Sequence, residues 1–177
     1  DAAGNVLTHT DFNHQTTSYQ YDVNSQVIQI TYADGTTERF TYDAEGDRLS
    51  ASNAQGTTNY EYDAQNRLAK ESQPDGTVLS YDYDAQGNRT QVTVTTGSQN
   101  SVTRYTYDSL NRLSSVIDAQ NEETHYSYDA VGNRTEMKLP NGITALYSYD
   151  TRNRLTALRN QTSAGQLLSA YQYQLDA

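Results

Sequence analysis

The sequence of 177 residues contains no cysteine and no tryptophan, and it has only two prolines, Pro74 and Pro140. Without cysteine, neither a disulfide framework nor a thiolate metal site is possible. No stretch is long and apolar enough to span a membrane, and the sequence contains no apolar h-region of a signal peptide, so we expect no membrane insertion.

Basic residues are also scarce. The chain has 12 lysines and arginines against 22 aspartates and glutamates, which gives a formal net charge of −10. Phosphate backbones and anionic lipids are bound by clustered lysine and arginine, so this charge balance argues against a nucleic-acid partner. It favours solubility and long-range repulsion between copies.

Large apolar residues other than tyrosine are also scarce. Leucine, isoleucine, valine and phenylalanine together make up less than ~20% of the residues, and a strongly charged chain with so few of them is usually disordered. Against this stand 16 tyrosines, because disordered chains are poor in aromatic residues. We therefore predict a folded chain in which tyrosine provides most of the apolar burial.

Pairs of tyrosines separated by one residue recur along the chain and define an internal repeat. The pairs are Tyr19/Tyr21, Tyr60/Tyr62, Tyr81/Tyr83, Tyr105/Tyr107, Tyr126/Tyr128, Tyr147/Tyr149 and Tyr171/Tyr173, with Phe40/Tyr42 as a variant. An aspartate follows directly at Asp22, Asp43, Asp63, Asp84, Asp108, Asp129 and Asp150. Successive aspartates lie 20 to 24 residues apart. We predict that residues 1–177 are one array of about eight repeats of about 21 residues, without a second domain.

The residues after the aspartate alternate between two forms. A form with glycine ends at Arg48, Arg89 and Arg134, and a form without glycine ends one residue earlier, at Arg67, Arg112 and Arg154. This difference predicts alternating long and short turns and a double repeat of roughly 42 residues.

Each repeat has the pattern of a β-hairpin. In Tyr-x-Tyr both rings share one face of a strand, and the residue between them is polar in every copy. A second set of turns is predicted at Asp34-Gly35, Gln55-Gly56, Asp75-Gly76, Gln120-Asn121, Asn141-Gly142 and Ala164-Gly165. The fold class is therefore all-β, an antiparallel meander of about sixteen strands, and a twisted sheet of that width should curl into a strip.

The nonapeptide Tyr-Asp-Tyr-Asp-Ala-Gln-Gly-Asn-Arg at residues 81–89 resembles the YD repeat of the Rhs family. That family includes bacterial Rhs toxins, the B and C components of Tc toxins, wall-associated YD proteins and teneurins. The resemblance implies a spiralling β-strip that builds a shell, which encloses a C-terminal toxic domain in the toxins and supports extracellular contacts in teneurins. The shells of this family end in a self-cleaving core segment with an Asp-Pro-x-Gly-type signature. Neither Pro74 nor Pro140 follows an aspartate, so this segment is absent from the sequence. What the resemblance implies is a shell wall without its cargo or protease.

No residue stands out as catalytic, cofactor-binding or metal-binding. The motif aspartates and arginines recur once per repeat, which favours turn ion pairs and arginine stacking on tyrosine over catalysis. His9, Asp11 and His14 lie close together but are too few for a convincing metal site. The turns lack the spacing of known calcium loops. Asn88, Asn133 and Asn160 begin glycosylation sequons, two of which belong to the turn motif itself.

The resemblance to the Rhs family implies a non-catalytic structural segment, secreted or at the cell surface and bacterial, that forms the wall of a β-shell around another domain. Two alternatives remain: a carbohydrate-binding or adhesive module that uses exposed tyrosines, and a self-associating extracellular fibre subunit. Asp1-Ala2 and Asp176-Ala177 both resemble the opening of a turn. We therefore expect further repeats of the same chain, or identical subunits, to pair with the open strand edges.

Overall fold

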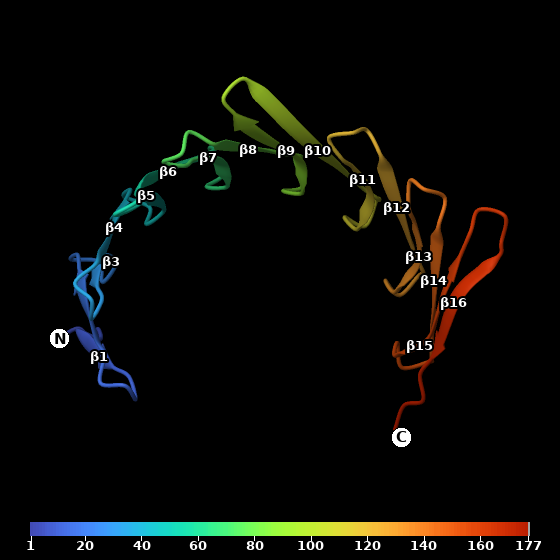
Figure 1. The fold of residues 1–177 in the computed structure, drawn as a ribbon, viewed down its shortest axis with the longest axis horizontal. Helices are drawn as coiled ribbons and strands as arrows, with labels where there is room; N and C mark the ends of the chain where they lie inside the picture. The colour runs from blue at the N-terminus through green and yellow to red at the C-terminus, as the bar shows by residue number, and fades with distance from the viewer. Residues whose placement is uncertain (177) are drawn as a thin grey trace. The chain divides into compact units, whose positions relative to one another are not determined.

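The computed structural model describes residues 1–176, and all of its regular structure is β (Figure 1). Within those residues there is no helix, and so none that could cross a membrane. The sheet order follows the chain order. The strands are β1 (Thr8–Thr10), β2 (Thr16–Tyr21), β3 (Val27–Thr31), β4 (Thr37–Tyr42), β5 (Arg48–Asn53), β6 (Gly56–Tyr62), β7 (Leu68–Ser72), β8 (Val78–Tyr83), β9 (Arg89–Thr96), β10 (Gln99–Tyr107), β11 (Leu113–Ile117), β12 (Glu123–Tyr128), β13 (Arg134–Lys138), β14 (Thr144–Tyr149), β15 (Leu155–Gln161) and β16 (Leu167–Gln172).

Two units make up the chain. The first consists of Asp1–Tyr81 with Thr93–Asn100, and the second of Asp82–Val92 with Ser101–Ala177. In the first unit each strand from β1 to β7 pairs antiparallel with the strand that follows it. In the second unit the same holds from β10 to β15. The predicted antiparallel meander is therefore confirmed.

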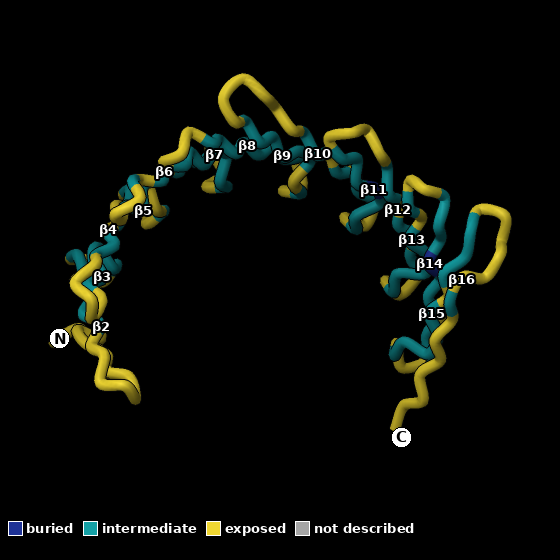
Figure 2. Tube along the Cα trace, viewed as in Figure 1, coloured by how far each residue is buried: buried dark blue, intermediate teal, exposed yellow. Residues whose placement is uncertain are grey.

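The tyrosine pairs share one face of their strands. In seven of the eight pairs both aromatic residues are half-buried and the residue between them is exposed, as in β12, where Tyr126 and Tyr128 flank Ser127. Figure 2 shows the same contrast between half-buried strands and exposed turns. Only Ala145 and Ser115, each 3% exposed, are fully buried among the described residues. The faces are thus lined by half-buried rather than deeply buried side chains, because each residue packs mainly on its cross-strand neighbours.

The prediction of long and short turns is wrong. In both forms the aspartate N–H donates to the carbonyl of the fourth residue after it, as in Asp43 to Asp47 at 3.0 Å and Asp63 to Arg67 at 2.9 Å. The third residue has positive φ in both, 98° at Gly46 and 56° at Asn66. Asparagine tolerates this left-handed conformation almost as glycine does, so it replaces glycine without shortening the turn. The arginine moves by one position while the backbone stays the same.

A β-bulge follows each of these turns for which the pairing is known. In the β4–β5 pair, Tyr42 lies opposite Arg48 but Thr41 lies opposite Ser50, which leaves Leu49 as the extra residue. The extra residue is the sixth after the aspartate in every such hairpin, and the set is Ile28, Leu49, Ala69, Ser114, Thr135 and Thr156. Bulges increase local twist and redirect side chains.

The second set of turns forms where the sequence predicts it. Gly35, Gly56, Gly76, Asn121, Gly142 and Gly165 all have positive φ. Two further turns are not predicted by the sequence, one at Asp11–His14 between β1 and β2 and one at Gly97 between β9 and β10. The turn at Gly97 closes the longest hairpin, which accounts for the 24-residue interval between Asp84 and Asp108. The final predicted turn at Asp176-Ala177 includes Ala177, which lies outside the described residues.

Candidate functional site: the tyrosine-aspartate turn

The motif aspartate caps its own turn. At Asp129, Oδ1 accepts the backbone N–H groups of Val131 at 3.0 Å and Asn133 at 2.8 Å. The same pair of bonds, to the second and fourth residues, recurs at Asp1, Asp22, Asp43, Asp63, Asp84, Asp108 and Asp150. These carboxylates act as fixed hydrogen-bond acceptors that hold the turn.

Hydrogen bonding lowers the pKa of five of these carboxyl groups, those of Asp63, Asp84, Asp108, Asp129 and Asp150. The backbone N–H of the fourth residue is the largest cause at Asp63, Asp108 and Asp150. At Asp84 and Asp129 the largest cause is the side-chain amide of Asn88 or Asn133. Bonds made to the ionised form favour that form, so these groups are poor general bases near neutral pH.

The second carboxylate oxygen binds the side chain of the fourth residue. In the turns with asparagine at the third position, Oδ2 accepts from Arg67 Nε at 2.7 Å, Arg112 Nε at 2.7 Å and Arg154 Nε at 2.8 Å. These three ion pairs were predicted and are confirmed. In three of the four turns with glycine, an asparagine amide takes that place, from Asn5, Asn88 and Asn133.

The arginines of the glycine turns lie over aromatic rings. Arg48, Arg89 and Arg134 stand one residue later in the turn than Arg67, Arg112 and Arg154. Arg48 lies 4.7 Å from the centre of the Phe40 ring, and Arg89 lies 5.2 Å from that of Tyr105. Arg134 lies over both Tyr126 at 5.9 Å and Tyr147 at 4.6 Å. Predicted arginine stacking on tyrosine is confirmed.

The tyrosine directly before the aspartate makes a contact that the sequence did not reveal. Its hydroxyl donates to a backbone carbonyl 14 to 18 residues earlier, always that of the fifth residue after the preceding aspartate. The bonds are Tyr21 to Val6 (2.8 Å), Tyr42 to Val27 (2.8 Å), Tyr62 to Arg48 (3.0 Å), Tyr107 to Arg89 (2.9 Å), Tyr128 to Leu113 (2.9 Å) and Tyr149 to Arg134 (3.0 Å). We call this contact the tyrosine latch.

The latch replaces a missing bond in the sheet. Between β11 and β12 the register runs from Ile117↔Glu123 to Ser115↔His125 and stops there. The carbonyl of Leu113 lies beyond that point and accepts from Tyr128. A buried or half-buried carbonyl without a partner is costly, so the hydroxyl satisfies it and joins consecutive repeats. A constant tyrosine at this one position is the signal that could have indicated the latch.

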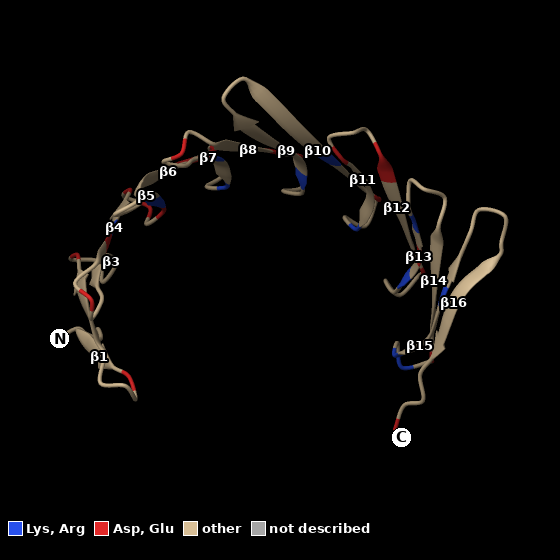
Figure 3. Cartoon of the chain, viewed as in Figure 1, with Lys and Arg blue, Asp and Glu red and all other residues tan. Residues whose placement is uncertain are grey.

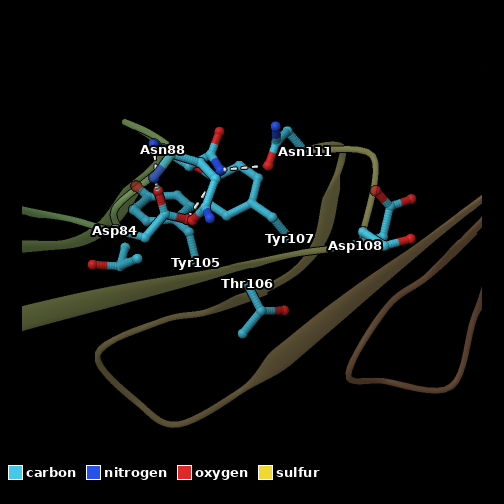
Figure 4. Close-up of a pocket in the computed structure, with 10 residues that line it drawn as sticks. Asp84, Asn88, Tyr105, Thr106, Tyr107, Asp108 and Asn111 are labelled. Carbon is cyan, nitrogen blue, oxygen red and sulfur yellow. Dashed lines mark hydrogen bonds between the residues drawn. The ribbon is translucent and has the colours of Figure 1, made fainter.

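A groove lies between the turns that begin at Asp84 and Asp108 (Figure 4). Asn88 and Asn111 point toward one another above the rings of Tyr105 and Tyr107, and a bond of 3.1 Å joins Asn88 Nδ2 to Asn111 Oδ1. The lining side chains are carboxylates, amides, hydroxyls and two phenol rings. No histidine or lysine lines it, and no nucleophile is paired with a base there.

The remaining candidate residues occupy ordinary structural positions. Asp11 caps its own turn, and His14 has a positive φ of 59° at the third position of that turn. Among the described residues no three histidine, aspartate or glutamate side chains come together as metal ligands. In two of the sequons, the amides of Asn88 and Asn133 each donate to two acceptors.

Charges gather at the tyrosine-aspartate turns. Figure 3 shows basic residues at the turns after β6, β10, β12 and β14, beside the acidic residues that cap them. The ion pairs there are about one quarter to one third exposed, and surface pairs of this kind contribute ~0–1 kcal/mol each. The arrangement supports repeat cohesion through many small contacts.

Comparison with known proteins identifies the repeat. A family model described as "Teneurin YD-shell" matches residues 2–173. The crystal structure of TcdB2-TccC3-TEV superimposes with a TM-score of 0.78 at 18% identity, over 89% of this chain and 10% of that chain. The structure of the Photorhabdus luminescens Tc holotoxin pore gives 0.78 at 18% identity, over 89% and 9%. The structure of TcdB2-TccC3 gives 0.76 at 17% identity, over 89% and 10%. A search of curated protein sequences finds no match. The chain thus spans about one tenth of the length of the structures it matches.

Proposed function

Because this chain belongs to the teneurin YD-shell family, we propose that it is a wall segment of a β-shell that encloses or displays another domain. In this proposal the segment is non-catalytic, and the protein that contains it is bacterial and either secreted or exposed at the cell surface. Its partners are further repeats of the same kind and a C-terminal domain inside the shell.

The observation that carries the proposal is the recurrence of one contact set. Each repeat has the same capped turn, and the latch from a tyrosine to the preceding repeat is seen six times. Catalysis needs one convergent constellation, whereas a wall needs every repeat to hold its neighbour. The cohesive contacts are therefore spread along the chain.

Carbohydrate binding ranks lower as a function for the tyrosines. A sugar stacks on a free ring face and bonds to free hydroxyl groups. Here six hydroxyls of the second tyrosine donate to backbone carbonyls, and arginines lie over Tyr105, Tyr126, Tyr128 and Tyr147. A fibre subunit remains an alternative, since the same strand edges could pair with identical copies.

Limited proteolysis of the natural polypeptide that carries this segment with its flanking sequence tests the enclosing role. We expect a domain joined to the repeats to survive trypsin at a concentration that degrades the same domain expressed alone. Equal rates of cleavage in the two settings, with the repeats themselves intact, would overturn the proposal.

A further inference from the structure

The turns of neighbouring repeats are of two types, and the types alternate. Glycine turns carry glycine as the third residue after the aspartate and begin at Asp1, Asp43, Asp84 and Asp129. Asparagine turns carry asparagine there and arginine as the fourth residue, and begin at Asp63, Asp108 and Asp150. The turn at Asp22 occupies an asparagine-turn place with Ser25 as its third residue. Since both types share one backbone, backbone geometry does not require the alternation.

Side-chain bonds between neighbouring turns do follow it. The fourth residue of a glycine turn donates to the third residue of the next turn: Asn88 to Asn111 at 3.1 Å and Asn133 to Asn153 at 3.0 Å. At the N-terminal end Asn5 donates to the hydroxyl of Ser25 at 3.1 Å. In each case the acceptor is a side chain that a glycine turn does not have.

The reverse contact has its own chemistry. The fourth residue of an asparagine turn is an arginine, and Arg112 NH1 donates to the backbone carbonyl of Asp129, the first residue of the next glycine turn, at 2.9 Å. The same guanidinium lies 4.7 Å from the centre of the Tyr128 ring. Gln26, at the corresponding position, donates to the backbone carbonyl of Gly46 at 3.3 Å. The acceptors on a glycine turn are therefore main-chain oxygens.

We propose that these contacts form a recognition rule, in which a glycine turn accepts an asparagine turn as its following neighbour and an asparagine turn accepts a glycine turn. The unit of assembly is then the pair of repeats. Two adjacent glycine turns would leave the asparagine of the first without its acceptor in the second. This rule rests on the proposed wall function and adds to it, because it specifies which type of hairpin can lie next to each hairpin of the wall.

Three asparagines that share one backbone conformation provide the test. Asn66, Asn111 and Asn153 are third residues of asparagine turns with φ of 56°, 58° and 60°. Asn111 and Asn153 accept from the preceding turn, whereas the corresponding residue of the turn before Asn66 is Asp47, which has no amide to donate. Glycine relaxes the left-handed backbone equally at all three positions.

We expect Asn66→Gly to leave the thermal unfolding midpoint level or raise it. The unfolding midpoints of Asn111→Gly and Asn153→Gly should each lie about 2–4 °C below the midpoint of Asn66→Gly. This is the shift that loss of one hydrogen bond produces in a chain of this size. That deficit should disappear when the donor is already absent, in Asn88→Ala and Asn133→Ala backgrounds.

Scanning calorimetry of these variants in the full chain decides the matter. The rule is overturned if the three glycine variants change the midpoint alike, or if the deficit persists in the backgrounds without the donor. Neither result affects the proteolysis test, which depends on enclosure and not on turn type.

Discussion

The tyrosine latch gives the sharpest prediction about what holds the repeats together. Replacing Tyr128 with phenylalanine removes one hydroxyl and keeps the ring, its packing and the Arg112 guanidinium 4.7 Å away. The substitution deletes the 2.9 Å bond to the carbonyl of Leu113. That carbonyl lies where the β11–β12 ladder has ended, so no backbone N–H of β12 is in register to replace the lost donor.

The magnitude follows from the burial of the bond. A neutral hydrogen bond contributes ~0.5–1.5 kcal/mol, and leaving a buried acceptor unpaired costs ~1–3 kcal/mol. Both partners of the latch are half-buried, and water can reach part of the site, so we expect a loss of ~1 kcal/mol for Tyr128→Phe. Replacing Tyr42, Tyr128 and Tyr149 together, whose latch bonds are all half-buried, should cost ~3 kcal/mol.

Urea denaturation followed by far-ultraviolet circular dichroism measures the loss. The matched control is Tyr126→Phe, which removes a hydroxyl from the same face of the same strand where no hydrogen bond of that hydroxyl is seen. We expect Tyr126→Phe to change the free energy of unfolding by less than ~0.5 kcal/mol. Equal losses from the two substitutions would show that ring chemistry, and not the latch, matters.

Three further predictions concern acid, the second set of turns and the strand edge. Folding lowers the pKa values of five motif aspartates below 3.8, namely those of Asp63, Asp84, Asp108, Asp129 and Asp150. Their ionised forms therefore stabilise the folded chain fully above pH 3.8, and this stabilisation is lost as the pH falls through the lower folded-state pKa values. A urea midpoint that stays level from pH 4 to pH 3 would contradict this. Gly56→Ala should destabilise more than Gly35→Ala in the same urea assay, because a Cβ at Gly56 would lie 2.5 Å from Pro74 Cβ while Gly35 has open space; equal effects would refute the close approach. On or beside the last strand, β16, apolar side chains are 42–57% exposed: Leu167, Leu168, Tyr171 and Tyr173. Light scattering should therefore detect self-association of the chain, which should increase with salt as the net charge of −10 is screened. A chain that stays monomeric at high salt and high concentration would argue against association through this strand edge.

The sequence by itself determined the hairpins, their positions and their faces. Each of these features depends on residues close together in the chain: strand alternation on neighbouring residues, and turns on glycine, asparagine or aspartate within five positions. The prediction that Ser127 faces away from Tyr126 and Tyr128 needed nothing beyond that local pattern. The same holds for the second set of turns, such as Gly35 and Gly142.

Local patterns are ambiguous where two residue types share one conformation. Matching the asparagine of Asn-Arg with the asparagine of Gly-Asn-Arg predicts that one turn is shorter. In the structure Asn66 takes the position of Gly46, and Arg67 that of Asp47. The two sets of arginines therefore occupy different positions: Arg67 pairs with Asp63, and Arg48 lies over Phe40.

The tertiary structure alone decided the contacts between repeats. The acceptor of the Tyr128 hydroxyl, the bulge at Thr135 and the pairing of Asn133 with Asn153 all depend on which residue of the next repeat lies alongside. The contacting residue of the next repeat is about 15 to 20 residues away in the chain. The register between the two repeats is set by turn geometry and β-bulges, which cannot be deduced from the composition of a single repeat. Hydrogen bonds act over ~3 Å, so these partners are specified only when the hairpins have been brought together in space.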